Sequence, residues 1–295
     1  MAWTQLHMTL SGDDCSVVET TLEALGSLSI TLTDAEDQPF FEPAPGELPL
    51  WDRVNATVLF DESIDATHVH SVMEGLSGIT LSNWTEEHLA DEDWERRWMD
   101  EFEPIHFGAD LWVCPSWLTP PNPDAINLML DPGLAFGSGT HETTALCLEW
   151  LAEHSVTDRS VIDYGCGSGI LAIAALRLGA SSATGIDIDP EALIASRDNA
   201  EKNDISDEQF YVQLVDESPV EPADLMLANI LSGPLIHLAP TLAALTAENG
   251  DIVLSGILQE QAEDVRSAYL PWFDMDTATV KGDWCRLTGK RLATR

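Results

Sequence analysis

The chain has 295 residues, of which 44% are hydrophobic, enough for one large globular domain or two ordinary ones. It carries 51 acidic and 13 basic residues, a net charge of −38, which disfavours direct binding to nucleic acid because such binding normally uses a basic face. No apolar run approaches the roughly 18 residues of a membrane span, and the N-terminus lacks the basic and apolar regions of a signal peptide.

The first 90 residues alternate short strand patterns and helical patterns. Their order, β-α-β-β-α-β, is that of a small α+β ferredoxin-like sandwich, with strands expected at 4–10, 27–34, 55–60 and 78–85 and helices at 15–26 and 66–76. This part has sixteen acidic residues against one base, Arg53, and no cluster of catalytic residue types. We therefore predict a substrate-recognition domain over residues 1–90.

Residues 91–118 are predicted to be a connecting helix and linker. The stretch DEDWERRWMDEF at 91–102 places Trp94 and Trp98 four residues apart, on one face of a helix. From about residue 125 strand and helix patterns alternate, which implies a parallel sheet with helices on both faces. We predict that this second domain spans 119–295.

A glycine-rich segment, Gly165-Cys166-Gly167-Ser168-Gly169, lies between a buried-strand pattern and a helical pattern. Glycines at such a turn let the backbone approach a ligand, and the helix N-terminus offers free amide donors. The next strand ends in Asp187, twenty-two residues after Gly165. A carboxylate there can accept hydrogen bonds from both ribose hydroxyls of a cofactor that contains adenosine.

The spacing of the glycines separates two classes of cofactor. The dinucleotide fingerprint is G-x-G-x-x-G, whereas this turn reads G-x-G-x-G and follows an acidic residue, Asp163. A carboxylate would repel a pyrophosphate and suits a cationic ammonium group. The turn resembles the E/D-x-G-x-G-x-G signature of class I S-adenosylmethionine methyltransferases, and this resemblance favours S-adenosyl-L-methionine as the cofactor.

Residues 223–231 predict another strand, which ends in a polar residue, Asn229. Asn229 would lie at the carboxyl edge of the sheet, where ligands of open α/β folds bind. In the superfamily that the glycine turn resembles, an Asn/Asp-Pro-Pro-Tyr motif at this point positions a nitrogen acceptor, but this chain has Asn-Ile-Leu-Ser. The missing prolines and aromatic residue weaken the interpretations in which glutamine or adenine is methylated.

The late part of the chain predicts a helix at 233–250, a strand at 251–258, a helix at 260–270 and two neighbouring strands. Strands joined by a short turn suggest an antiparallel addition at the edge of the sheet. The predicted fold class is therefore α/β: a class I (Rossmann-like) methyltransferase domain with a mostly parallel seven-stranded sheet, preceded by the ferredoxin-like domain.

The five cysteines, which are Cys15, Cys114, Cys147, Cys166 and Cys285, are scattered and form no CxxC motif. This argues against disulfides and structural zinc and fits a reducing cytosol. We expect a cytoplasmic protein without a metal site or a membrane contact. The acidic charge fits either a solvated surface suited to a salty cytoplasm or attraction to a basic partner protein.

Five segments together resemble one family, the bacterial methyltransferases of ribosomal protein L11. They are DWERRWMDEF, DPGLAFGSGTHETT, VIDYGCGSGILAIAALRLGA, GIDIDPEA and ANILSGPL, and the resemblance covers essentially the whole chain. It implies an enzyme that uses S-adenosylmethionine to trimethylate lysine side chains and the N-terminal amine of ribosomal protein L11. It also implies cofactor contacts at Thr144, Gly165, Asp187 and Asn229, to which the glycine turn adds Gly167.

The resemblance implies a role for each part of the site. The loop at 131–144 would fold over the methionine end of the cofactor, and Thr144 would direct its hydroxyl at the ligand. Asn229 is the candidate catalytic residue, because its carbonyl can orient the acceptor amine. His141 is a candidate general base, although it can equally shape the loop. The acidic residues 1–90 would capture a basic ribosomal protein.

Three other functions remain open from the sequence. The first is a methyltransferase of the same fold that acts on another protein or on RNA. The second is a nicotinamide oxidoreductase, which the glycine spacing disfavours. The third is a non-catalytic protein that retains the cofactor fold.

Overall fold

The computed structural model describes residues 3–36, 51–76, 78–89, 102–108, 110–131, 141–215 and 217–293. The chain divides into two units, Met1–Met99 and Asp100–Arg295. The predicted helix at 91–102 and all but the two ends of the predicted loop at 131–144 lie outside the described residues.

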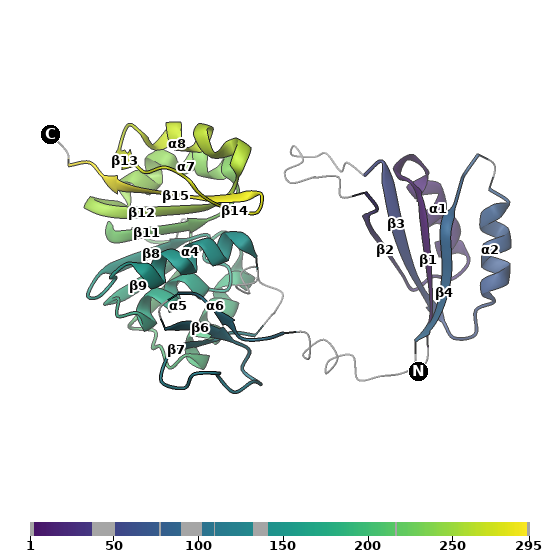
Figure 1. The fold of residues 1–295 in the computed structure, drawn as a ribbon, viewed down its shortest axis with the longest axis horizontal. Coiled ribbons are helices and arrows are strands. Elements are labelled where there is room, and N and C mark those ends of the chain that lie inside the picture. The colour runs from purple at the N-terminus through teal and green to yellow at the C-terminus, as the bar shows by residue number, and fades with distance from the viewer. Residues whose placement is uncertain are drawn as a thin grey trace. The chain divides into compact units, whose positions relative to one another are not determined.

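The first unit is a four-stranded antiparallel sheet with two helices on one face (Figure 1). The strand order, β2-β3-β1-β4, is that of the predicted ferredoxin-like sandwich. Its core joins Leu6, Val58 and Phe60 of the sheet to Leu22 and Val69 of the helices. In chain order the elements are β1 (Trp3–Ser11), η1 (Gly12–Asp14), α1 (Cys15–Ala24), β2 (Ser29–Asp34), β3 (Arg53–Asp61), α2 (Ala66–Glu74) and β4 (Ser82–Leu89).

Strand β4 begins at Ser82, four residues later than the sequence pattern predicts. Gly78 has a φ of +84°, in the left-handed region, which belongs to a turn rather than to a strand. The apolar residues Ile79 and Leu81 pack against the core of this unit from that turn. The strand prediction was therefore wrong at its start, because apolar residues of a packed turn resemble those of a strand.

The second unit is built on a large sheet, whose described strands run in the order β10-β9-β8-β11-β12-β15-β13, with β14 paired to β15 alone. The strands from β10 to β12 are parallel and the later ones antiparallel. This mixed sheet confirms the predicted fold class, and with β14 it has eight described strands where the sequence predicted seven. The strands are β8 (Ser160–Tyr164), β9 (Ser182–Asp187), β10 (Phe210–Leu214), β11 (Ala223–Asn229), β12 (Thr246–Leu258), β13 (Phe273–Met275), β14 (Thr279–Lys281) and β15 (Trp284–Arg291).

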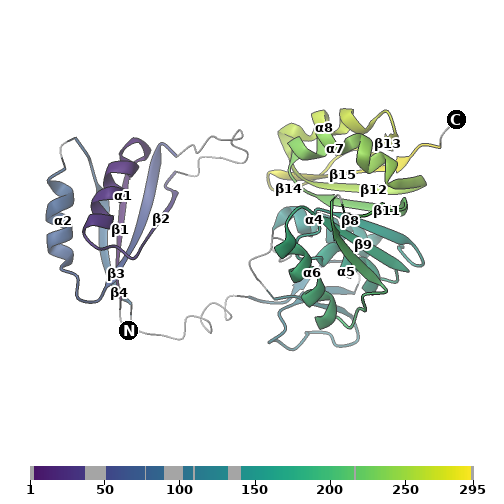
Figure 2. The same cartoon turned by 180° about the vertical axis from the view of Figure 1, so that it is seen from behind.

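Helices cover both faces of this sheet (Figures 1 and 2). One core lies between the sheet and α4, α5 and α6, and the other lies between the sheet and α7 and α8. Buried on both faces, the parallel strands are almost continuously apolar, as Val161 and Ile162 of β8 illustrate. The helices are α4 (Glu142–Glu153), α5 (Ile170–Arg177), α6 (Pro190–Lys202), α7 (Ser232–Ala244), η2 (Gln259–Gln261) and α8 (Ala262–Tyr269).

A small sheet of three strands, β5 (Ile105–His106), β6 (Leu111–Cys114) and β7 (Ile126–Met129), precedes α4. It packs into the α4–α5 core through Phe107, Leu111 and Leu128. The strand at β7 agrees with the alternation of strands and helices predicted from about residue 125, whereas β5, with two residues, is too short to show a period of its own.

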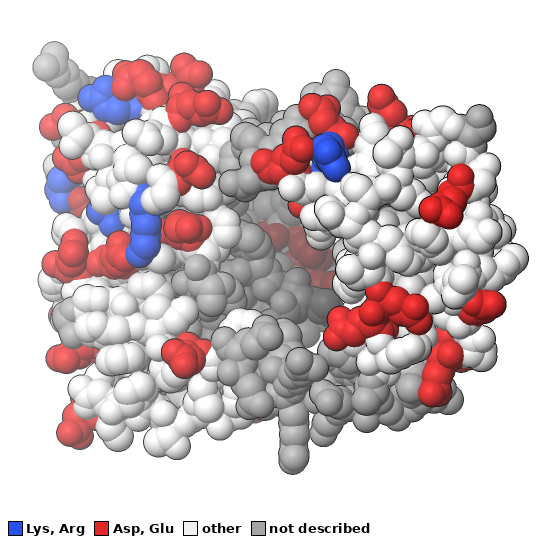
Figure 3. Space-filling view, turned by 45° about the vertical axis from the view of Figure 1, so that its right-hand side comes forward, with Lys and Arg blue, Asp and Glu red and all other residues white. Residues whose placement is uncertain are grey.

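On the face that Figure 3 shows, acidic side chains are spread over the described parts of both units, with few Lys and Arg among them. All five cysteines are free and buried. Among the described residues, no group of His, Cys, Asp and Glu side chains is arranged to hold a metal ion. None of the described helices is long and apolar enough to cross a membrane.

Candidate cofactor and active site

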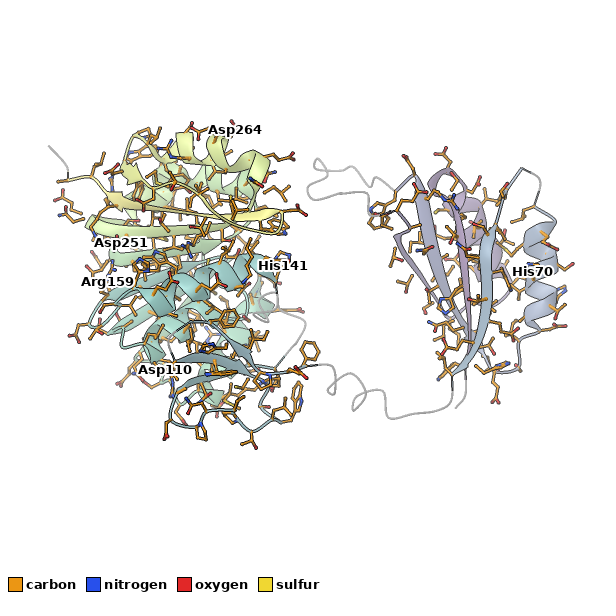
Figure 4. All side chains as sticks on the ribbon, in the orientation of Figure 1. His70, Asp110, His141, Arg159, Asp251 and Asp264 are labelled. Atoms are coloured by element: carbon orange, nitrogen blue, oxygen red, sulfur yellow. The ribbon has the colours of Figure 1, made fainter. Side chains whose placement is uncertain are left out.

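A cavity of about 540 Å³ lies at the carboxyl edge of β8, β9 and β11. The turns after these strands form its floor, and α4, α7 and β15 add side walls. In Figure 4, His141 lies at this carboxyl end of the strands. Arg159 and Asp251 lie at the opposite end of the strands, where they form an ion pair of 2.8 Å. The five residues that the sequence predicts for the site all line the cavity: Thr144, Gly165, Gly167, Asp187 and Asn229.

The glycine turn follows β8 and is tied to the neighbouring strand. The amide of Gly165 donates to the carbonyl of Ile186 over 2.7 Å. Gly165, Gly167 and Gly169 have φ values of +76°, +53° and +76°, which L-residues with a side chain rarely adopt. A Cβ on Gly165 would also overlap Cγ2 of Ile230. The turn therefore requires glycine both for its backbone conformation and for space.

Asp187 ends β9 with its carboxylate already held in place. Oδ2 accepts a hydrogen bond from the amide of Gly167 at 2.9 Å, and Oδ1 accepts one from the amide of Asp189 at 3.0 Å. A carboxylate oxygen can accept more than one hydrogen bond, so both oxygens can still bind a ligand diol. The next residue, Ile188, is 83% exposed, and Val215 lies with it in the cavity lining. This apolar pair offers surface for a flat ring beside the carboxylate.

Asp163 lies beneath the glycine turn with only 1% of its surface exposed. Its Oδ2 accepts a hydrogen bond from the amide of Ala172 at 3.1 Å. Burial raises the pKa of Asp163 to about 7; the Ala172 amide opposes this rise, and the charge of Asp187 adds to it. A ligand cation in the cavity would favour the ionised carboxylate.

Asn229 and Thr144 contact each other in the wall of the cavity. Asn229 ends β11, and Thr144 lies in the first turn of α4. The Asn229 amide nitrogen Nδ2 donates to Thr144 Oγ1 at 3.2 Å. The Asn229 carbonyl oxygen Oδ1 is buried and has no hydrogen-bond partner among the described residues. Leaving a buried acceptor unpaired costs about 1–3 kcal/mol, so this oxygen suits a donor that a ligand brings.

His141 is the N-cap residue of α4. This contact favours a role in shaping the loop at 131–144 over the role of a general base. Its Nδ1 accepts a hydrogen bond from the amide of Thr143 at 3.3 Å and lies 2.9 Å from the Thr143 hydroxyl. A neutral ring that accepts at Nδ1 carries its proton on Nε2 and cannot accept another one there. The ring also packs edge-on against Trp284, with centroids 5.0 Å apart.

The sequence reasoning missed several lining residues, including Ile188, Ile230, Gly256 and Trp284. Gly256 has a φ of +82°, and a Cβ there would overlap the backbone of Ile230. A lone glycine in the strand pattern DIVLSGIL is the signal that points to such a close approach. Trp284 had no comparable signal, because it reaches the cavity only through the pairing of β15 with β12.

The charges of the lining indicate the kind of ligand. The described lining residues include two carboxylates, Asp163 and Asp187, and no Lys or Arg. A diphosphate would be repelled here, whereas a cationic ligand with a ribose and a flat ring would be complemented. The site therefore disfavours a nicotinamide dinucleotide and fits a sulfonium nucleoside.

Comparisons with known proteins agree with this arrangement. A family model described as ribosomal protein L11 methyltransferase (PrmA) matches residues 2–292. Relatives of the same name from Ectopseudomonas mendocina (strain ymp) and Shewanella baltica (strain OS195) are each 50% identical to this chain. The first is aligned over 98% of this chain and 99% of the relative, the second over 99% and 100%.

A solved structure shows the same likeness. The crystal structure of ribosomal protein L11 methylase from Lactobacillus delbrueckii subsp. bulgaricus is 34% identical, with a TM-score of 0.58. The match covers 65% of this chain and all of that one. Because the family model and the relatives match nearly the full length, the chain belongs to the ribosomal protein L11 methyltransferase (PrmA) family.

Proposed function

We propose that this chain transfers methyl groups from S-adenosylmethionine to ribosomal protein L11, trimethylating lysine side chains and the N-terminal amine. Family membership and the names of the relatives support the activity and the substrate. The observation that carries the proposal is the buried, unpartnered Oδ1 of Asn229, beside the glycine turn and the Asp187 carboxylate. A ribosomal substrate places the proposed activity in the cytoplasm.

The residues of the cavity fit S-adenosylmethionine part by part. Asp187 would hold the ribose hydroxyls, and Ile188 and Val215 would pack on the adenine. Gly165 and Gly167 line the cavity with backbone alone, and the carboxylate of Asp163 complements the ammonium group of the methionine part. When bound, S-adenosylmethionine supplies an electrophilic methyl group on its sulfonium.

The chain's own residues prepare the acceptor amine. A lysine ammonium has a pKa near 10.4 and must lose its proton before it can act as a nucleophile. Apolar walls, formed in part by Leu231, Pro234 and Leu238, favour the uncharged amine because they desolvate it. The oxygen Oδ1 of Asn229 would accept an N–H of the amine and orient its lone pair toward the reacting carbon.

Residues 1–90 would be the substrate-recognition domain and residues 119–295 the methyltransferase domain. Of the predicted connection, residues 91–118, the part that forms β5 and β6 packs into the core of the second unit. The sixteen acidic residues and single base of the first part support this role, because such a charge attracts a basic protein over a long range. Capture by charge weakens as salt rises. Deleting residues 1–90 should therefore abolish protein methylation and leave cofactor binding intact.

The direct test is intact-mass spectrometry of recombinant ribosomal protein L11 after incubation with this chain and S-adenosylmethionine. We expect mass gains in methyl-sized steps that cluster in threes. No gain, with S-adenosylmethionine still bound by calorimetry, would reject ribosomal protein L11 as the substrate. Loss of both methylation and binding would reject the proposed cofactor site as well.

A further inference from the structure

Helix α7 presents an uncharged face to solvent. Residues 225–247, which include α7, contain no Asp, Glu, Lys or Arg, in a chain in which 22% of residues are charged. Leu235, Ala239 and Leu242 of α7 are buried in the core. The opposite side of the helix is exposed and carries Pro234, Ile236, His237, Pro240 and Ala244.

The other outer helices of this unit differ from α7. α6 exposes Glu191, Asp198 and Glu201, and α8, which packs beside α7, exposes Glu263 and Asp264 (Figure 1). A surface helix normally places charged residues on its solvent side. The lack of charge on α7 is therefore a property of this helix and not of the whole surface around it.

The uncharged face continues into the cavity. Leu231, immediately before α7, lines the cavity and is 47% exposed, and Pro234 and Leu238 of the helix also line it. Ile236, two residues after Pro234 and therefore about 200° further round the helix, is 41% exposed and does not line the cavity. A protein that inserts an amine past Leu231 and Pro234 would place its neighbouring residues beside this helix.

We propose that the solvent face of α7 docks an apolar, uncharged segment of the protein substrate that adjoins the methylated amine. The inference rests on the proposed function and names the surface that the substrate uses. A basic segment would be matched by carboxylates, which this chain has in excess and which this face lacks. The acidic surface would capture the substrate, and α7 would then hold the neighbouring segment so that the amine is aligned with the cavity.

A second copy of the chain is a poorer occupant for this face. Leu231 and Pro234 line the cavity and are also exposed, so the exposed face of α7 adjoins the cavity. A self-association that covered the face would therefore also cover the entrance through which a protein amine must pass. A substrate that arrives and leaves at each turnover uses the same surface without blocking it.

The test substitutes Ile236 by charges of both signs, Ile236→Glu and Ile236→Lys. Matched controls are Ile194→Glu and Ile194→Lys on α6, where Ile194 is 57% exposed on the opposite face of the sheet. We measure KM and kcat of the full-length chain for recombinant ribosomal protein L11, and the calorimetric Kd for S-adenosylmethionine. Both Ile236 variants should raise KM about tenfold and leave kcat and Kd within twofold. Both Ile194 variants should match the wild type.

The charge pair distinguishes apolar docking from electrostatics. If Ile236→Glu lowers KM and Ile236→Lys raises it, the face acts only through charge and the proposal is wrong. A wild-type KM in both variants also overturns it, as does a wild-type dimer that Ile236→Glu converts to a monomer with unchanged KM. Failure of the wild type to methylate the substrate would instead reject the proposed function.

Discussion

The amide nitrogen of Asn229 donates to the hydroxyl of Thr144 across 3.2 Å, joining two residues 85 positions apart in the chain. Asn229 ends strand β11, and Thr144 lies in the first turn of α4. Because the amide nitrogen is engaged, the carbonyl oxygen of Asn229 is the group left without a partner in the described part of the chain. The bond thus sets an acceptor in the cavity before a ligand arrives, and such preorganisation is a large part of catalysis.

Removing either partner of this bond should slow methyl transfer. We expect Asn229→Ala to lower kcat about 10²-fold and Thr144→Val about tenfold, since the second change frees the Asn229 side chain without removing it. Single-turnover rates at saturating S-adenosylmethionine measure both effects. In the double variant, Thr144→Val should lower kcat little further than Asn229→Ala does alone, because the two residues act as one unit. Fully multiplicative losses would contradict that coupling.

Asn229→Ala should also change which methyl transfer is slowest. The uncharged amino group of a lysine or N-terminus has two N–H groups and its monomethylated form has one, but its dimethylated form has none to donate to Asn229 Oδ1. The variant should therefore lose more rate in the first two transfers than in the third. A time course of intact masses would show unmodified protein and few intermediates. Accumulation of the dimethylated form would argue against this contact.

Gly165→Ala should abolish cofactor binding, because a Cβ there overlaps Cγ2 of Ile230 in addition to straining the backbone. Gly26→Ala is the matched control: Gly26 also has positive φ, +91°, but open space around it. The control should lose only about 1 kcal/mol of stability and keep its affinity for S-adenosylmethionine. Calorimetric titration and thermal unfolding measure the two effects. Partial recovery in the double variant Gly165→Ala with Ile230→Ala would identify the overlap as the cause.

Asp187→Asn should weaken S-adenosylmethionine binding by about 10- to 100-fold, the usual effect of losing hydrogen bonds to a charged group. Asp189→Asn is the control, since Asp189 caps α6 by accepting from the amide of Glu191 at 2.9 Å, and Asn caps helices equally well. Its affinity should stay within twofold of the wild type. Equal losses in the two variants would mean that the turn, and not the Asp187 carboxylate, determines affinity.

Asp163→Asn should stabilise the ligand-free chain, and more so at higher pH. The ordinary pKa of 3.8 applies to the unfolded state, whereas burial raises the pKa in the folded state to about 7. Between these values the folded state holds one more proton, so wild-type stability falls as pH rises and levels off above pH 7. From pH 5.5 to 8 the advantage of Asp163→Asn should grow by about 2 kcal/mol, at roughly 1.4 kcal/mol per pH unit.

Urea denaturation of the second unit at both pH values measures this change. Asp198→Asn, on the exposed side of α6, is the control and should show no pH-dependent advantage. An advantage of Asp163→Asn that is the same at pH 5.5 and pH 8 would show that Asp163 is ionised throughout, contrary to the raised pKa.

The sequence alone determined the fold class and the elements around the cofactor turn. A buried strand, three glycines and a following helix are a local pattern, since the backbone freedom of glycine and the apolar run of β8 act within a few residues. The placement of Asp187 at a strand end is equally local. Periodicity also predicted the antiparallel sheet of the first unit, because its short strands and helices follow the order β-α-β-β-α-β.

Tertiary structure alone decided how distant segments meet. Ile230 fills the space beside Gly165 and Gly256, and Trp284 reaches the cavity only because β15 pairs with β12. The run at 225–247 contains no charged residue, yet packing buries only one side of α7 and leaves Ile236 exposed to solvent. Hydrophobicity determines which residues favour burial, but the area that the core can cover determines which of them are buried.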